Sequence, residues 1–217
     1  MSQEIYTFII VLAGWIFSVC LHEWAHAFVA YQGGDTTVKD KGYLSFNPLK
    51  YTDPFLSIVL PIVFLLMGGL GLPGGAVYIE SHLLKSKWWD TMVSLAGPAA
   101  NVILALVLVL ILRFIPPAEG AQPALAFLAL LQVTAVLFNM IPFPGFDGFG
   151  ALRPHLDAET QHAAASFGMF GFIGVILLMQ IPAVFNSVWG VVQLICLTLG
   201  LDPHLINAGI DQFTFWR

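Results

Sequence analysis

Long uncharged runs separated by short polar connections dominate the chain. Residues 92–112, 124–141 and 163–201 contain no Asp, Glu, Lys or Arg. An uncharged run of about 18 or more residues is a candidate membrane span, and the last run is long enough for two spans broken near Pro182. Residues 7–31 form a further apolar run, interrupted only by two histidines and a glutamate. This pattern predicts an integral, multi-pass membrane protein.

Composition agrees with a membrane protein and excludes several other classes. The 217 residues are 58% hydrophobic, with 8 Lys and Arg against 13 Asp and Glu. There is no basic run, so nucleic acid is not expected as a partner. Cys20 and Cys196 both lie in apolar runs, which indicates small buried hydrophobic side chains rather than a disulfide framework.

Three ionisable residues interrupt the apolar run 7–31. His22 and His26 stand at positions i and i+4, on one face of a helix, where both imidazoles can bind one Zn²⁺. Glu23, next to the first histidine, can act as a general base. A charged side chain near the bilayer centre costs roughly 2.5 to 3.5 kcal/mol on insertion scales. Because this cost is concentrated in one short segment, a metal site is favoured over a chance match of histidines hydrogen-bonded within a bundle.

A catalytic zinc site needs a third protein ligand and an open position. Asp147 follows the run 124–141 within the segment NMIPFPGFDGFG, whose prolines stop the helix and whose glycines allow tight backbone. Non-helical backbone at membrane depth is tolerated only where it is buried in protein or lines a watery cavity. These residues alone leave open whether Asp147 is a ligand or part of an ordinary Asp-Gly turn. The other histidines lie in polar connections and are expected to be solvated: His82, His155, His162 and His204.

Three short motifs follow one another between Ser18 and Gly150. They are HEWAH at 22–26, GPAAN at 97–101 and NMIPFPGFDG at 139–148. In these motifs the chain resembles the site-2 proteases, a family of intramembrane zinc metalloproteases. The family patterns are His-Glu-x-x-His, Gly-Pro-x-x-Asn and Asn-x-x-Pro-x-Pro-x-x-Asp-Gly. All three in this order are much more specific than any one of them alone.

The resemblance implies a role for five residues. It implies that His22, His26 and Asp147 bind Zn²⁺ and that Glu23 is the general base. It also implies that Asn139 positions or polarises the scissile carbonyl, because a buried amide donor suits a developing oxyanion.

Two further positions qualify the resemblance. For Asn101 we favour a helix-packing hydrogen bond. Phe149 stands where many relatives have a second glycine after Asp-Gly, which would narrow the site without removing a ligand.

The PDZ and CBS modules of some relatives are absent, so a compact, single membrane-embedded domain is expected over 1–217. Its catalytic core would span 7–150, followed by C-terminal helices at 151–217.

The uncharged run 54–79 poses a question of topology. If it crossed the bilayer, Asp147 would emerge on the side opposite His26, a mismatch of roughly 20 Å against a metal–oxygen distance of about 2 Å. If the run instead folds back, all but one of the eight Lys and Arg residues share a side with the site, Arg113 being the exception. The positive-inside rule then places the site toward the cytoplasm. We therefore predict a re-entrant segment, an all-α polytopic fold of about five transmembrane helices and a short β-hairpin.

The segment 74–79, GGAVYI, has the composition of a short strand with an open edge. A protease must bind its substrate extended, because a helix hides the scissile carbonyl in its own hydrogen bonds, and edge-strand pairing holds extended peptides. A strand that only packs over the site is an equal alternative.

The predicted function is zinc-dependent hydrolysis of a peptide bond in or near a transmembrane segment of a membrane-protein substrate. The alternative is a metal or ion transporter, since intramembrane His and Asp residues also mark ion pathways. A transporter has no need of Glu23 beside the first ligand. An inactive scaffold is disfavoured, because no ligand or base is missing. The lipid bilayer and a transmembrane protein or peptide are the expected partners, and the oligomeric state is left open.

Overall fold

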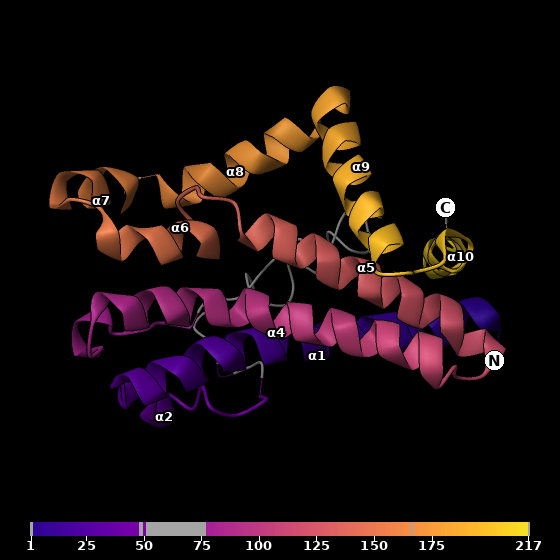
Figure 1. Cartoon of the computed structure of the whole chain (residues 1–217), viewed down its shortest axis with the longest axis horizontal. Helices are drawn as coiled ribbons and strands as arrows, with labels where there is room; N and C mark the ends of the chain where they lie inside the picture. The colour runs from indigo at the N-terminus through magenta and orange to yellow at the C-terminus, as the bar shows by residue number, and fades with distance from the viewer. Residues whose placement is uncertain (1, 48–49, 51–76, 166, 217) are drawn as a thin grey trace.

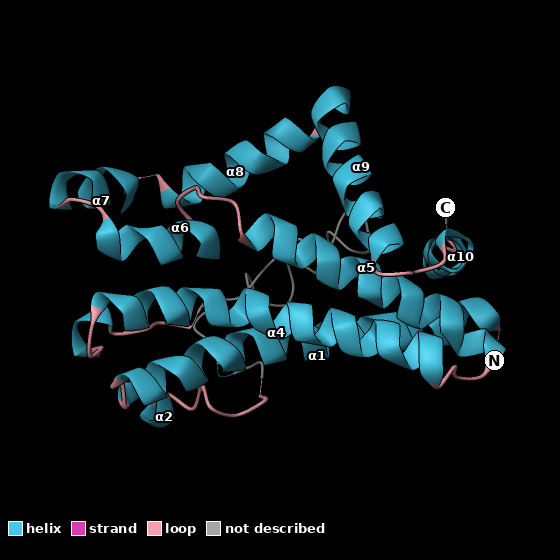
Figure 2. Ribbon diagram, viewed as in Figure 1, coloured by secondary structure: helices cyan, strands magenta, loops and turns pink. Residues whose placement is uncertain are grey.

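The computed structural model describes residues 2–47, 50, 77–165 and 167–216, and Figure 1 shows how their helices are arranged. Three long helices lie side by side: α1 (Gln3–Gly33), α4 (Lys87–Phe114) and α5 (Gln122–Asn139). Helix α4 runs antiparallel to both α1 and α5 (Figure 1). As Figure 2 shows, the described residues form helices and loops and contain no strand.

The end of α1 and the start of α4 lie next to each other. Gly34 follows α1 with a φ of 121°, a conformation that favours glycine and ends helices. Ser86 caps α4, its hydroxyl oxygen accepting a hydrogen bond from the N–H of Trp89. The N–H of Lys85 donates to the carbonyl of Gly33 at 2.9 Å. The chain therefore leaves α1 and enters α4 at the same end of the bundle, with the short helix α2 (Thr37–Asp40) close by.

Helix α5 is the central helix. In the most apolar part of the helical segment Glu119–Asn139, which comprises α5 and the preceding turn η4 (Glu119–Ala121), 78% of residues are buried. The corresponding shares are 33% for α1 and 39% for α4. The main core lies where these helices meet and includes Val11, Trp15, Leu108, Phe127, Leu130 and Leu131. Helices α1 and α4 thus keep outward apolar faces, as expected for helices in contact with lipid.

Helix α10 (Pro203–Phe213) packs on α5 and α1 near the N-terminus of the chain. The Thr7 hydroxyl donates to Oε1 of Gln212 at 2.7 Å. A Cβ at Gly209 would overlap the carbonyl oxygen of Pro123 on α5. This close approach of two backbones requires a glycine at position 209.

The rest of the C-terminal half is an arm of short helices. It comprises α6 (Asp147–Leu152), the turn η5 (Arg153–His155), α7 (Ala158–Ala165), α8 (Gly168–Met179) and α9 (Pro182–Thr198). Asp157 precedes α7, and hydrogen bonds from the backbone N–H and hydroxyl of Thr160 lower the pKa of its carboxyl. Helices α8 and α9 meet at 93°. Pro182 is the first residue of α9, a position where its lack of an N–H costs no helical hydrogen bond.

The described residues contain three to four of the roughly five predicted spans. Among the described residues, α1, α4 and Glu119–Asn139 are each long and apolar enough to cross a membrane, and α8 with α9 makes a fourth if the bent pair is one span. The predicted count of about five is therefore not reached in this part of the chain. The predicted re-entrant segment and β-hairpin lie largely in 51–76, outside the described residues, and 77–79 carry no strand.

Candidate metal centre

Two elements far apart in sequence bring the predicted ligands together. His22 and His26 lie on neighbouring turns of α1, and Asp147 is the first residue of α6, which follows the turn after α5. The Nε2 atoms of the two histidines are 3.0 Å apart. The Asp147 carboxylate lies 3.2 Å from Nε2 of His22 and 3.4 Å from Nε2 of His26. The three predicted ligands therefore form one cluster.

The ligand atoms of this cluster lie 3.0 to 3.4 Å apart, slightly closer than in a tetrahedral zinc site. With metal–ligand distances of 2.0–2.2 Å, tetrahedral ligand atoms lie about 3.3 to 3.6 Å apart. Oδ2 of Asp147 is buried and has no hydrogen-bond partner among the described residues, which is costly for a carboxylate oxygen unless a cation satisfies it. Two imidazoles and one carboxylate are also a common catalytic zinc ligand set. The residues present thus fit a zinc ion.

The other ring nitrogen of each histidine is held by an acceptor. Nδ1 of His26 lies 2.7 Å from the carbonyl oxygen of Val93, and Nδ1 of His22 lies 2.5 Å from Oδ1 of Asn101. A carbonyl oxygen can only accept, so Nδ1 carries the proton and donates it. Each Nε2 then presents its lone pair to the space between the ligands, which is the tautomer a metal requires.

Glycines allow the close approach of the elements around the cluster. A Cβ at Gly97 on α4 would overlap Nε2 of both histidines. In the turn before α6, Gly145 has a φ of 102°, and a Cβ at Gly148 would overlap the carbonyl of Met140. The Asp-Gly pair therefore serves both purposes left open by the sequence: Asp147 faces the histidines, and Gly148 makes the turn possible.

Glu23 and Asn139 lie in the wall of the same cavity as the three predicted ligands. The cavity has a volume of about 400 Å³ and is lined by residues of α1, α4, α5 and α6, together with 77–79. Glu23 is 3% exposed, and its Oε2 accepts a hydrogen bond from the N–H of Val77 at 3.1 Å. Asn139 is the last residue of α5. Their catalytic roles stay predictions, but both side chains are at the site.

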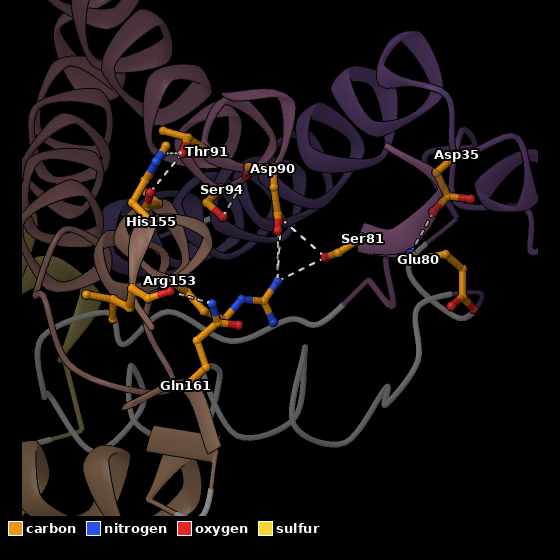
Figure 3. Close-up of polar contacts among 11 residues, drawn as sticks. Asp35, Glu80, Ser81, Asp90, Thr91, Ser94, Arg153, His155 and Gln161 are labelled. Carbon is orange, nitrogen blue, oxygen red and sulfur yellow. Dashed lines mark hydrogen bonds and ion pairs between the residues drawn. The ribbon is translucent and has the colours of Figure 1, made fainter. Parts of the chain in front are cut away.

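A polar cluster, drawn in Figure 3, lies at the rim of this cavity, and its members Ser81, Asp90 and Arg153 line the cavity. One guanidinium nitrogen of Arg153 lies 3.2 Å from the Asp90 carboxylate and donates to the Ser81 hydroxyl at 2.9 Å. The N–H of Glu80 donates to Asp35 at 2.8 Å. These contacts tie the segment that follows Val77 to α4, to the turn after α6 and to the turn after α1. This cluster was not predictable from the sequence, because its members belong to no motif.

A second cavity, of about 510 Å³, adjoins the first at α6. It shares Asp147, Gly150 and Arg153 with the first cavity and extends along α7 to His162. Phe149 lines this second cavity and not the first. The predicted narrowing by Phe149 therefore concerns this second cavity rather than the cavity that contains Glu23.

The remaining histidines do not join the cluster. Nε2 of His155 lies 2.9 Å from the hydroxyl of Thr91, and the side chain of His82 is 73% exposed. His162 and His204 are also exposed. Among the described residues, the only group of three potential ligands is His22, His26 and Asp147.

Asn101 has a second role besides the one that the sequence indicated. Its Nδ2 donates to Ser18 at 3.1 Å and to Gln132 at 2.8 Å, which are the helix-packing bonds we expected. Its Oδ1 accepts the bond from His22. No sequence signal linked Gln132 or Ser18 to the site, because both are uncharged residues within apolar runs.

The fold and site thus define a membrane-embedded metallopeptidase centre with an HExxH helix, and comparisons with known proteins agree. Residues 7–119 match the family model Peptidase family M50. The chain is 46% identical over 211 residues to Rip2 of Mycolicibacterium smegmatis, a candidate zinc metalloprotease by its name, covering 96% of this chain and 81% of that protein. Rip2 of Mycobacterium tuberculosis strain H37Rv is 41% identical with the same coverage. YwhC of Bacillus subtilis, named in the same way, is 30% identical, covering 91% of this chain and 85% of that protein.

The chain belongs to peptidase family M50, the site-2 protease family. No solved structure matches it. The prediction of a metalloprotease made from the three motifs is confirmed. The transporter alternative is not favoured.

Proposed function

We propose that this protein is a zinc-dependent endopeptidase that cleaves a membrane-protein substrate in or near its transmembrane segment, within the bilayer. The observation that carries the proposal is the buried cluster of His22, His26 and Asp147, with Glu23 beside it in one cavity. Three helices long and apolar enough to span a membrane surround or adjoin that cavity. A water-requiring reaction is therefore enclosed by helices that face lipid.

The residues of the chain divide the chemistry among them. Bound zinc would supply a Lewis acid and a source of hydroxide at neutral pH. Glu23 takes a proton from the attacking water and later delivers it to the leaving amine. Asn139, at the end of α5, donates its amide N–H to the oxygen of the scissile carbonyl as negative charge develops there.

The segment 77–79 is the place where we propose that an extended substrate lies. It lines the cavity, and its first N–H is bonded to Glu23. A peptide laid along this segment would have its backbone beside the base and the metal ligands. Backbone pairing of this kind gives affinity without demanding a particular sequence.

The test is Glu23→Gln, assayed in the full chain in lipid nanodiscs. We expect cleavage to fall by at least about 10²-fold, the usual contribution of a general base, with the zinc content unchanged because both imidazoles remain. Glu80→Gln is the matched control, since the Glu80 carboxylate lies at the rim and pairs with Lys41; it should keep most of the activity. Substrates are found by comparing membrane proteins of cells that carry the wild type and Glu23→Gln. An active Glu23→Gln protein would refute the mechanism.

We also propose a multi-pass topology with the site toward the cytoplasm. Helices α1 and α4 are antiparallel and joined end to start by the bond from Lys85 to Gly33, which supports a connection that returns to the side it left. Lys39, Lys41 and Lys87 lie at this end of the bundle, whereas Arg113 lies in the last turn of α4. This bias fits the positive-inside rule.

Cysteine labelling tests the topology. Single cysteines replace Lys50 and Lys87 in a background that lacks Cys20 and Cys196. An impermeant thiol reagent added outside intact cells should label neither position, and both should react once the membrane is opened. Labelling of one position from outside would mean that the run 54–79 crosses the bilayer, and the proposed topology would be abandoned.

A further inference from the structure

A chain of buried polar groups links the three long helices next to the metal ligands. Gln132 on α5 and Ser18 on α1 are 0% and 1% exposed, and Asn101 on α4 is 4% exposed. Among these side chains, the hydroxyl of Ser18 donates to Oε1 of Gln132 at 2.5 Å, and Nδ2 of Asn101 donates to the same oxygen at 2.8 Å. This series of hydrogen bonds ends at Nε2 of Gln132, which donates to the carbonyl of Leu128 at 3.4 Å.

Each bond in this chain fixes the direction of the next. The carbonyl of Leu128 can only accept, so the amide nitrogen of Gln132 faces it and Oε1 faces Asn101. Asn101 must then turn its amide nitrogen toward Gln132 and its oxygen toward His22. That oxygen accepts from Nδ1 of His22, which leaves the lone pair of Nε2 for the metal.

The opposite direction of these hydrogen bonds would disable the site. If the Gln132 amide turned over, two carbonyl oxygens would face each other at Leu128, and Asn101 would have to turn its oxygen toward Gln132. The amide nitrogen of Asn101 would then donate to Nδ1 of His22, and the proton of the neutral ring would move to Nε2. An Nε2 that carries a proton cannot bind a metal ion.

We infer that Gln132 is a positioning residue: acting through Asn101, it selects the metal-binding tautomer of His22. This inference rests on the proposed function, because it assigns the cluster to zinc. Gln132 itself touches neither the ligand atoms nor a substrate. Partners of this kind typically change metal affinity by 10- to 100-fold when removed.

The first measurement is the zinc dissociation constant of the full chain, obtained by competition with a chelator. Gln132→Leu removes the closer of the two acceptors of the Asn101 amide and leaves only the Ser18 hydroxyl, which can also donate and therefore does not fix the amide's direction. We expect zinc to bind about tenfold more weakly. Gln132→Glu keeps an acceptor whether or not the carboxyl is protonated, so the affinity should return to within about threefold of the wild type. The matched control is Thr134→Val, which removes a buried hydroxyl on the same helix that bonds only to Leu130 among the described residues. It should leave zinc affinity unchanged.

The second measurement reads the tautomer directly. ¹⁵N NMR of histidine-labelled protein after zinc removal distinguishes a proton on Nδ1 from one on Nε2, and His22→Gln assigns the signal. We expect the Nδ1–H form in the wild type and a mixture in Gln132→Leu, a change that a merely structural role would not produce. If Gln132→Leu does not fold, the wild-type spectrum decides alone: a proton on Nε2 overturns the inference.

A double variant tests the path through Asn101. If Gln132 acts through Asn101, then Gln132→Leu should weaken zinc binding no further in an Asn101→Ala background. Fully additive losses, or wild-type affinity in a folded Gln132→Leu protein, would overturn the inference. Neither measurement needs a substrate. A protein that binds zinc as described but cleaves no membrane peptide would refute the proposed function and leave the role of Gln132 intact.

Discussion

Gly97→Ala places a methyl group against both metal-binding imidazoles. The new Cβ would lie 2.5 Å from Nε2 and 2.6 Å from Cε1 of His22, and would overlap Nε2 of His26. Ordinary contacts are 3.4–4 Å, so each ring must retreat by about 1 Å. The backbone of α4 is held by its packing on both α1 and α5, so the rings are the groups that move.

The cost of that movement sets the size of the effect. Driving a side chain about 30° from its rotamer costs about 0.5–1.5 kcal/mol, so two imidazoles lose about 1–3 kcal/mol. Because 1.4 kcal/mol corresponds to a tenfold change in an equilibrium constant, zinc should bind about 5- to 150-fold more weakly. The change should reach cleavage only through the loss of metal.

Zinc affinity by chelator competition and the midpoint of thermal unfolding together test this prediction. Gly174→Ala on α8 is the control, since a Cβ there meets nothing within 4 Å; its zinc affinity should equal that of the wild type. A Gly97→Ala protein that binds zinc within about twofold of the wild type would show that α4 does not press on the histidines, and the described geometry of the site would be wrong.

Three further predictions concern the third ligand, the rim and the end of the bundle. Asp147→Ala should lose zinc whereas His155→Ala should retain it, as measured by metal content after gel filtration; the opposite result would mean that the third ligand is misassigned. Arg153→Gln and Asp90→Asn should show a coupling of at most about 1 kcal/mol in unfolding free energy, because the guanidinium side chain is 44% exposed and the ion pair is screened by solvent. Gly209→Ala should lower the stability by about 1–3 kcal/mol through overpacking without changing zinc affinity, and unchanged thermal unfolding would refute the close contact of α10 with α5.

Candidate metal ligands whose spacing matches a helix face or a motif were predictable from the sequence. The histidines at 22 and 26 share a helix face by geometry alone, and the motif around Asp147 indicated the third ligand, which the structure places 3.2 and 3.4 Å from them. The break near Pro182 was also predictable, because proline cannot continue a helix, although the 93° angle depends on packing that the sequence does not encode locally.

Contacts made by uncharged residues, or by residues that belong to no motif, were not predictable from the sequence. Gln132 and Ser18 sit in apolar runs where no spacing rule distinguishes a functional amide from a buried packing residue. Asp90 and Arg153 are 63 positions apart and meet only because α6 lies across the start of α4. The division into a catalytic core at 7–150 and C-terminal helices stays a prediction.

The distance in sequence between the predicted ligands has a consequence for the synthesis and membrane insertion of the protein. His22 and His26 lie in α1, but Asp147 is synthesised 121 residues after His26. At about 5–20 residues per second, this interval lasts roughly 6 to 24 s. During it, the nascent chain holds a base and two imidazoles but no complete ligand set, so peptide-cleaving chemistry is withheld from the insertion machinery and from neighbouring chains. Only the insertion of α5, which carries α6 behind it, brings Asp147 to the two histidines and completes the predicted ligand set.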